Sequence, residues 1–307
     1  MPNELQELAT FLENSRIQGK LIFGIMENRH LRLRQMLLDE DVKEGFRKDF
    51  LKRVGQYQQY RDIVAYNPNG FREDEVHKLK LSNIPNAEPL LQDATDNVTN
   101  FNDKFIKSIK FLVFRFKNSD QKVVSVFKYY PKTKFLMRHN AYFFTNGTLK
   151  FSRSDVIGLA ASIDCVSDGE NMLVINRNPF EKIFSYSHIY LASATSLFQK
   201  FSTGGDFKIA GIDDLQVKVT KSLGKLRRLH NVYNTGSYRI YNYALIKQIN
   251  DDNDLGITFA GTGNNRTVTF PTTTVFMDVY EDAYLESRYT SKKYLALSKR
   301  ERSAKQS

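Results

Sequence analysis

The chain has 307 residues, 41% of them hydrophobic, which is enough for one large domain or two ordinary ones with a substantial core. Lysine and arginine number 45 against 34 acidic residues, and the net charge of +11 favours an anionic partner: nucleic acid, an acidic protein or a membrane surface. No run of sequence reaches the roughly 18–20 apolar residues of a membrane-spanning helix. The polar, acidic first twenty residues are unlike a secretory signal, and the single cysteine, Cys165, excludes an internal disulfide. We therefore expect a cytoplasmic protein.

The first hundred residues predict helices alternating with strands. Residues 4–16 carry apolar side chains on one helical face, and residues 20–38 are typical of two short strands around a turn at Asn28. Residues 39–60 predict a helix, and residues 82–103, polar with two prolines, predict an irregular connection. The expected buried stripe of the 39–60 helix is Val42, Phe46, Phe50, Leu51 and Val54.

From residue 104 to about 177, short strand-like runs alternate with turn residues, which predicts an antiparallel meander. A short helix is expected within residues 152–167, capped by Ser154 or Asp155. Residues 256–271 predict a hairpin. Helical patterns are found at 179–201, 212–233, 237–250 and, at the end of the chain, 281–307. The predicted fold class is α+β: an antiparallel β-meander with flanking helices, then a mainly helical C-terminal part with one hairpin.

The positive charge is concentrated in one stretch. Between Lys104 and Arg153 lie twelve basic residues and a single acid, Asp120, so this stretch carries +11 and the rest of the chain sums to zero. A second acid-free run, residues 215–250, carries seven basic residues. Like charges held close together repel one another unless an anion lies between them. A polyanion therefore explains the concentration better than solubility does, and neutralised phosphates would also release counterions.

Strand alternation suggests how this charge is displayed. Arg115 and Lys117 share the face opposite Phe114 and Phe116, so we expect an aromatic face in the core and a basic face in solvent. The alternative is an ordinary solvated strand face, on which lysine also protects against edge pairing. The residues expected to contact DNA are Lys110, Arg115, Lys117, Lys128, Lys132, Lys134 and Arg138 on the strands, with Lys221, Lys225 and Arg228 as one stripe on the helix beginning near Asp213.

Patterns for a metal, a cofactor or a catalytic nucleophile are missing from the sequence. The five histidines are far apart, one cysteine cannot start a zinc site, and no phosphate-binding loop occurs. We expect no metal, no cofactor and no catalytic residue. A metal-dependent nuclease with a noncanonical acidic site stays open as an alternative. Its candidate carboxylates are Asp164, Asp168 and Glu170; Asp251, Asp252 and Asp254; and Glu281 with Asp282.

Two blocks of sequence carry a family resemblance. The first, residues 163–186, contains Ile163-Asp164, Gly169, the apolar run Met172–Ile175, Phe180-Glu181, Phe184 and Tyr186. The second, residues 276–299, supplies Asp278, Asp282, Tyr284-Leu285, Ser287, Tyr294 and Lys299. Together they resemble the KwaB family, the DNA-binding subunit of the bacterial Kiwa anti-phage system, over about residues 104–300.

The resemblance implies DNA binding that obstructs phage DNA replication and expression, with no catalytic step. It also implies a cytoplasmic protein recruited to the inner face of the cell membrane by a small membrane partner, KwaA. The shared residues look structural: Phe180 and Phe184 would anchor a helix on the sheet, and Asp164 would serve a turn or cap.

Three functions are thus open: a sequence-independent DNA-binding effector, a nuclease, and a pure interaction module that docks an acidic or membrane-bound partner. We expect residues 1–100 to form an N-terminal α/β part, and residues 101–307 to pack as one DNA-binding unit. A homodimer is expected, because one basic patch makes few phosphate contacts and twofold dimers are the commonest oligomers.

Overall fold

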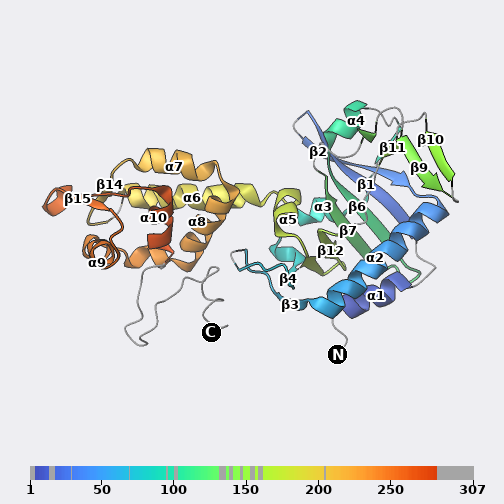
Figure 1. The fold of residues 1–307 in the computed structure, drawn as a ribbon, viewed down its shortest axis with the longest axis horizontal. Coiled ribbons are helices and arrows are strands. Elements are labelled where there is room, and N and C mark those ends of the chain that lie inside the picture. Colours follow the sequence, from blue (N-terminus) through green and yellow to red (C-terminus); the bar gives the residue numbers. More distant parts are fainter. Residues whose placement is uncertain are drawn as a thin grey trace. The chain divides into compact units, whose positions relative to one another are not determined.

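The computed structural model describes residues 4–13, 18–28, 30–68, 70–94, 96–99, 103–130, 136–137, 141–145, 148–152, 156–157, 162–203 and 205–281. The chain forms two compact units (Figure 1). Unit 1 is Met1–Tyr66 with Arg72–Phe184, and unit 2 is Asn67–Phe71 with Ser185–Ser307. This division differs from the expected one at residue 100, because strands from both sides of that position share one sheet.

Unit 1 is built on a nine-stranded sheet in the order β3-β4-β13-β12-β7-β6-β1-β2-β5. Its strands are β1 (Gln18–Glu27), β2 (His30–Leu37), β3 (Asp62–Ala65), β4 (Glu75–Lys80), β5 (Asp96–Asn97), β6 (Ile109–Lys117), β7 (Val123–Tyr129), β12 (Cys165–Ser167) and β13 (Asn171–Val174). All neighbours are antiparallel except β3–β4 and β2–β5 at the two edges. The central run β13-β12-β7-β6 confirms the predicted antiparallel sheet.

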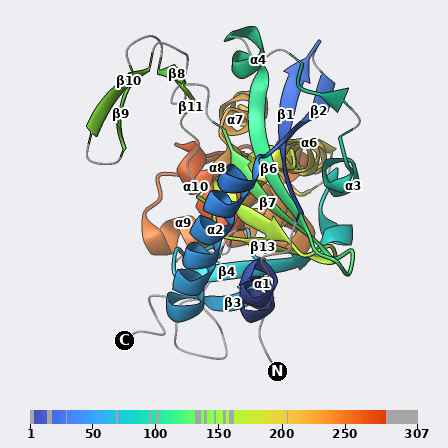
Figure 2. The ribbon, with the colours of Figure 1, turned by 90° about the vertical axis from the view of Figure 1, so that its right-hand side faces the viewer.

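Between β7 and β12 the chain leaves this sheet. The described strands here are β8 (Leu136–Met137), β9 (Ala141–Thr145), β10 (Thr148–Ser152) and β11 (Val156–Ile157). They pair as β9–β10 and β8–β11 in two separate small sheets (Figure 2), so the predicted meander is interrupted. Where a short helix was predicted, residues 156–157 and 165–167 are strand; its proposed caps, Ser154 and Asp155, lie outside the described residues.

Two helices, α1 (Glu4–Glu13) and α2 (Glu40–Tyr60), pack on one face of the sheet. Phe50 meets Phe114 and Phe116 with ring centroids 5.1 and 6.2 Å apart, so the even positions of β6 point into this core. Val42 is 42% exposed, so its place in the predicted stripe is wrong. The first turns of α2 bury the side chains of a lysine and an arginine instead.

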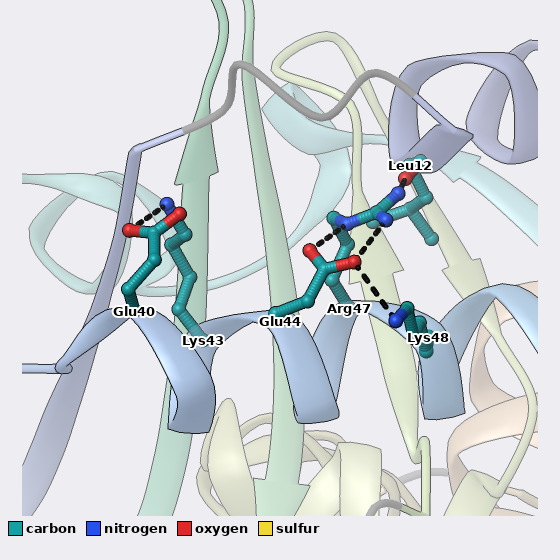
Figure 3. Close-up of polar contacts among 6 residues, drawn as sticks. All are labelled: Leu12, Glu40, Lys43, Glu44, Arg47 and Lys48. Carbon is teal, nitrogen blue, oxygen red and sulfur yellow. Dashed lines mark hydrogen bonds and ion pairs between the residues drawn. The ribbon is translucent and has the colours of Figure 1, made fainter.

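That arginine, Arg47, joins the two helices (Figure 3). Its guanidinium donates to the carbonyl of Leu12, one of the carbonyls left without a partner at the end of α1. It also holds Glu44 with Nε–Oε2 and Nη2–Oε1 distances of 2.7 and 2.5 Å. These hydrogen bonds lower the pKa of Glu44 to about 2. Beside them, Lys43 Nζ lies 2.6 Å from Glu40 Oε2.

The other helices of unit 1 are η1 (Leu81–Asn83), α3 (Ala87–Leu91), α4 (Asp103–Ser108) and α5 (Arg177–Ile183). The ring centroid of Phe184 lies 5.3 Å from that of Phe127 on β7 and 5.2 Å from that of Phe180. Phe180 and Phe184 therefore anchor α5 on the sheet, as expected. On β1, Gly24 allows close approach, because a Cβ there would lie only 2.2 Å from the ring of Phe111.

Unit 2 is mainly helical. Its elements are α6 (Tyr186–Thr203), β14 (Lys208–Ile209), α7 (Ile212–Thr220), α8 (Leu223–Thr235), η2 (Ser237–Ile240), α9 (Tyr243–Asn253), β15 (Thr258–Ala260), η3 (Gly263–Asn265), β16 (Thr267–Thr269) and α10 (Thr273–Tyr280). The antiparallel pair β15–β16 confirms the predicted hairpin. The predicted helix 179–201 is broken at Ser185, where φ is 57°, and the helix 212–233 is broken at Ser222, which caps α8. In the part of the chain that the structure describes, no helix is long and apolar enough to cross a membrane.

Candidate nucleic-acid interface

Arg115 lies on the predicted face of β6, but that face is covered. Its side chain is only 4% exposed, so the expectation that it belongs to a solvent-facing basic surface is wrong. The guanidinium donates to Asp93 Oδ1 at 2.8 Å, and to the carbonyls of Gln92 and Leu90 at 2.7 and 3.2 Å. It also donates to Ser125 Oγ at 3.2 Å. Arg115 therefore fixes the segment after α3 onto the sheet.

The Lys128 side chain is also mostly buried. Its side chain is 19% exposed, and its Nζ lies 3.7 Å from Oδ2 of Asp164, which is almost fully buried. The Asp164 carboxylate also accepts from Tyr129 N at 2.7 Å and Asn176 Nδ2 at 2.8 Å. Burial raises the pKa of Asp164, while Lys128 and these donors oppose the shift. Asp164 thus joins β7 to the end of β13, a larger role than the turn or cap predicted for it.

The remaining strand candidates divide into two groups. Lys110 and Lys117 are half-buried, and no carboxylate of the described residues lies within ion-pair distance of either. Lys132, Lys134 and Arg138 lie outside the described residues, so their predicted contact with DNA stays a prediction.

The second candidate set does not form one helical stripe. Lys221 is the C-cap residue of α7, whereas Lys225 and Arg228 belong to α8, so the prediction of a single helix is wrong. Lys225 Nζ donates to Thr273 Oγ1 at 2.7 Å. The Arg228 guanidinium is held by two carboxylates, with Nε 2.8 Å from Glu281 and Nη2 2.7 Å from Asp278 Oδ1. Its charge is therefore offset within the fold, and Lys221 is the exposed cation of the set.

A basic groove that the sequence analysis missed lies where the β1–β2 hairpin meets α4. It encloses about 600 Å³. Its lining consists of Met26, Glu27, Asn28, Arg34, Val98, Thr99, Lys104, Phe105, Lys107 and Ser108. We call this the α4 groove. Phe105 packs edge-on against Phe23 at 5.4 Å, which attaches α4 to the core beneath it.

The α4 groove has more positive than negative charge. Arg34 and the neighbouring Arg32 share one carboxylate, Glu27, at 3.1 and 3.7 Å. Lys104 and Lys107 are exposed, and within the described ranges neither has an ion-pair partner. Three of the lining residues, Arg34, Lys104 and Lys107, are therefore cations, against one acid, Glu27. An anion entering the groove would find two lysines that have no acidic partner among the described residues.

Two signals could have identified the groove. Lys104 and Lys107 are spaced i, i+3, which places them on one helical face, but the strand-like pattern that begins at residue 104 predicts strands there. Arg32 and Arg34 alternate on β2, on one side of that strand, but the first hundred residues are close to neutral overall. Nothing local to either segment indicates that the two meet.

Several of the candidate nuclease carboxylates have structural roles. Asp168 Oδ1 accepts from Glu170 N at 2.8 Å and Asn171 N at 2.7 Å, closing the β12–β13 turn. Asp254 caps the end of α9 in the left-handed region, and Asp282 lies outside the described residues. Among the residues that the structure describes, no three His, Cys, Asp or Glu side chains are grouped to hold a metal ion. Cys165 is buried, which raises its pKa well above the ordinary value.

Fold and charge define a mixed α/β protein with a basic groove on its larger unit. The sequence matches the family described as Kiwa protein KwaB-like over residues 106–290, more than half of the chain. The chain belongs to this KwaB-like family, which makes it a component of Kiwa anti-phage defence. No curated protein and no solved structure matches it. The matched region includes β6, β7, β12, β13 and all of the described helices of unit 2.

Proposed function

We propose that this protein is a non-catalytic, largely sequence-independent DNA-binding effector that obstructs replication or expression of phage DNA. The observation that carries the proposal is the α4 groove, where Lys104 and Lys107 are exposed and lack an acidic partner among the described residues. These two lysines begin the stretch of twelve basic residues and one acid. The groove replaces the covered Arg115 face as the proposed centre of the DNA-binding surface.

Phosphate is the ligand that this chemistry favours. Lysine is a flexible point charge that neutralises a phosphate without reading the base attached to it. Each neutralised phosphate releases condensed counterions, so binding should be strong at low salt and should weaken steeply as salt rises. Lys110 is the second residue of β6, directly after α4, and we expect it to extend the proposed surface.

The test compares two pairs of helical lysines. Replacing Lys104 and Lys107 by alanine should weaken duplex binding in a mobility-shift titration, and should reduce the slope of log K against log salt by about 0.9 per lost contact. The matched control replaces Lys48 and Lys52, which are exposed on α2. Equal loss in both variants would mean that only global charge matters. Undetectable binding by the native chain at low salt would contradict the proposal altogether.

Two further arms address specificity and chemistry. Duplexes of unrelated sequence should bind with similar affinity; a preference above about a hundredfold would require base readout and would contradict phosphate recognition. The same titration is repeated with Mg²⁺. Cleavage of the duplex that needs Mg²⁺ would overturn the non-catalytic part of the proposal in favour of a nuclease.

We further propose a homodimer and association with the membrane protein KwaA at the inner face of the cell membrane. Twofold pairing would double the basic surface that one duplex can contact. Light scattering at micromolar concentration should give twice the mass of one chain, and a monomeric mass would contradict the dimer. Co-expressed KwaA should carry the protein into the membrane fraction; a protein that stays in the supernatant would contradict the recruitment.

A further inference from the structure

Unit 2 contains a pocket that lies apart from every residue discussed above as a DNA contact. It encloses about 400 Å³ where the end of α6 meets η2 and the end of α10, a size within the usual range for small-molecule sites. The residues that matter to the argument are Lys200, Phe201, Tyr238, Arg239, Tyr241 and Tyr280.

The pocket has two cations at its rim. Lys200 Nζ donates to Tyr238 Oη at 2.8 Å and lies 5.3 Å from the centroid of the same ring. Arg239 lies over that ring at 5.7 Å. Both side chains are exposed, and no carboxylate within the described part of unit 2 forms an ion pair with either of them. The hydrogen bond from Lys200 contributes most to a lowered pKa of Tyr238, with Arg239 acting in the same direction.

These cations have hydrogen-bond capacity to spare. A lysine ammonium carries three donors and an arginine guanidinium five. One Lys200 donor is used on Tyr238, and the Arg239 contact to the same hydroxyl is long, at 3.5 Å. Most of the donors are therefore available to an anion. Both cations contact the Tyr238 hydroxyl, so we expect a single phosphate-sized group to reach both.

Below the cations the wall is aromatic. Phe201 and Tyr280 lie 4.5 Å apart, Tyr241 packs on Tyr280 at 5.2 Å, and Phe201 meets Tyr238 edge-on at 6.2 Å. Tyr280 is fully buried, while Phe201 and Tyr238 are half-buried. Contacts within the protein hold this aromatic wall in place. Gly236 ends α8 with φ of 69° and turns the chain into η2, and Ser237 Oγ donates to the Tyr280 carbonyl at 2.9 Å.

We propose that this pocket binds a nucleotide, with the base against the Phe201–Tyr238 wall and the phosphate between Lys200 and Arg239. A flat ring joined to an anion is the ligand class that matches an aromatic wall with cations at its rim. The nucleotide can be free in solution, or it can be an unpaired residue of a DNA strand. The site is independent of the α4 groove, so each proposal can fail without the other.

The first test uses calorimetry on the full chain with dAMP, deoxyadenosine and inorganic phosphate. We expect dAMP to bind at least about tenfold more tightly than either half-ligand, because only dAMP uses the wall and the cations together. Lys200→Gln and Arg239→Gln should each weaken dAMP by about tenfold or more, since each removes a charge-assisted contact. Lys218→Gln and Lys247→Gln, exposed on α7 and α9, are matched controls and should leave the affinity unchanged.

A second arm separates the two sources. If the ligand is a strand residue, a ten-residue dT oligonucleotide should displace dAMP at far lower concentration than dTMP does, and Lys200→Gln should weaken both. If the ligand is a free nucleotide, the oligonucleotide should displace dAMP no better than dTMP does at the same molar concentration. No heat with dAMP at millimolar concentration, or binding that survives both pocket substitutions, would overturn the proposal. Duplex binding in the Lys104/Lys107 variant is measured alongside, and dAMP affinity there should be native.

Discussion

The substitution Arg115→Met tests whether Arg115 stabilises the fold or contacts DNA. Methionine keeps the aliphatic stem but removes four hydrogen bonds, to Asp93, Ser125 and the carbonyls of Gln92 and Leu90. Asp93 is 66% exposed and can be rehydrated, but Ser125 is buried. At about 1 kcal/mol for each net hydrogen bond, with a further penalty for the stranded hydroxyl, we expect a loss of about 2–4 kcal/mol in the free energy of unfolding.

The assay is thermal unfolding of the full chain, followed by circular dichroism, with duplex binding measured in parallel. For a domain of 150–250 residues this loss corresponds to a fall of about 4–16 °C in Tm of unit 1. Lys117→Met is the matched control: it lies two positions along the same face of β6, half-buried and without an acidic partner in the described chain, and should leave Tm unchanged. An unchanged Tm in Arg115→Met, together with lost duplex binding, would refute the structural role.

Three other substitutions test separate parts of the fold. Gly24→Ala places a methyl group 2.2 Å from the Phe111 ring and should destabilise unit 1 by about 1–3 kcal/mol in a denaturant titration; native stability would show that the ring moves freely. Glu44→Gln should lower Tm most above pH 4.5, because the ionised Glu44 carboxylate stabilises the fold through Arg47 and its pKa is lowered to about 2. The difference in Tm between the native and substituted chains should disappear as pH falls towards 2. A difference that does not change with pH would contradict the ion pair. Arg228→Met leaves its two partly buried carboxylates without a cation and should destabilise unit 2 by about 2–4 kcal/mol at neutral pH, with partial recovery in acid; unchanged melting would contradict a buried pair.

Local rules predicted the elements of the first sixty residues and the two faces of β6 well. Alternation on β6 put Phe114 and Phe116 in the core, and the helix and hairpin patterns of the first sixty residues gave elements at nearly the expected positions. The alternation rule states which residues share a face, but it cannot state what covers that face. Arg115 is buried because the segment around Leu90 folds back over the sheet, and that contact is not local in sequence.

The candidate site was predicted less completely for the same reason. The charge count included Lys104 and Lys107, but the groove needs a second element, the β1–β2 hairpin, which no spacing rule connects to α4. On α2, the helical period allowed Val42 to be buried. The chain instead covers that turn with the stems of charged side chains whose ends reach Glu40 and Glu44.

The strand order of unit 1 has a consequence for how the protein is made. The strands synthesised first, β1 to β5, form the two outer flanks of the sheet, and the later strands β6, β7, β12 and β13 fill the middle. At about 5–20 residues per second, the ribosome reaches β6 within about 2 s of β5, but it completes β13, which pairs with β4, only roughly 4–15 s after β5. During that interval the β4 strand lacks its partner β13, so one of its edges stays unpaired. The sheet of unit 1 is therefore completed late, once its central strands have been synthesised. Neither residues 1–100 nor residues 101–307, expressed alone, should yield a stable sheet.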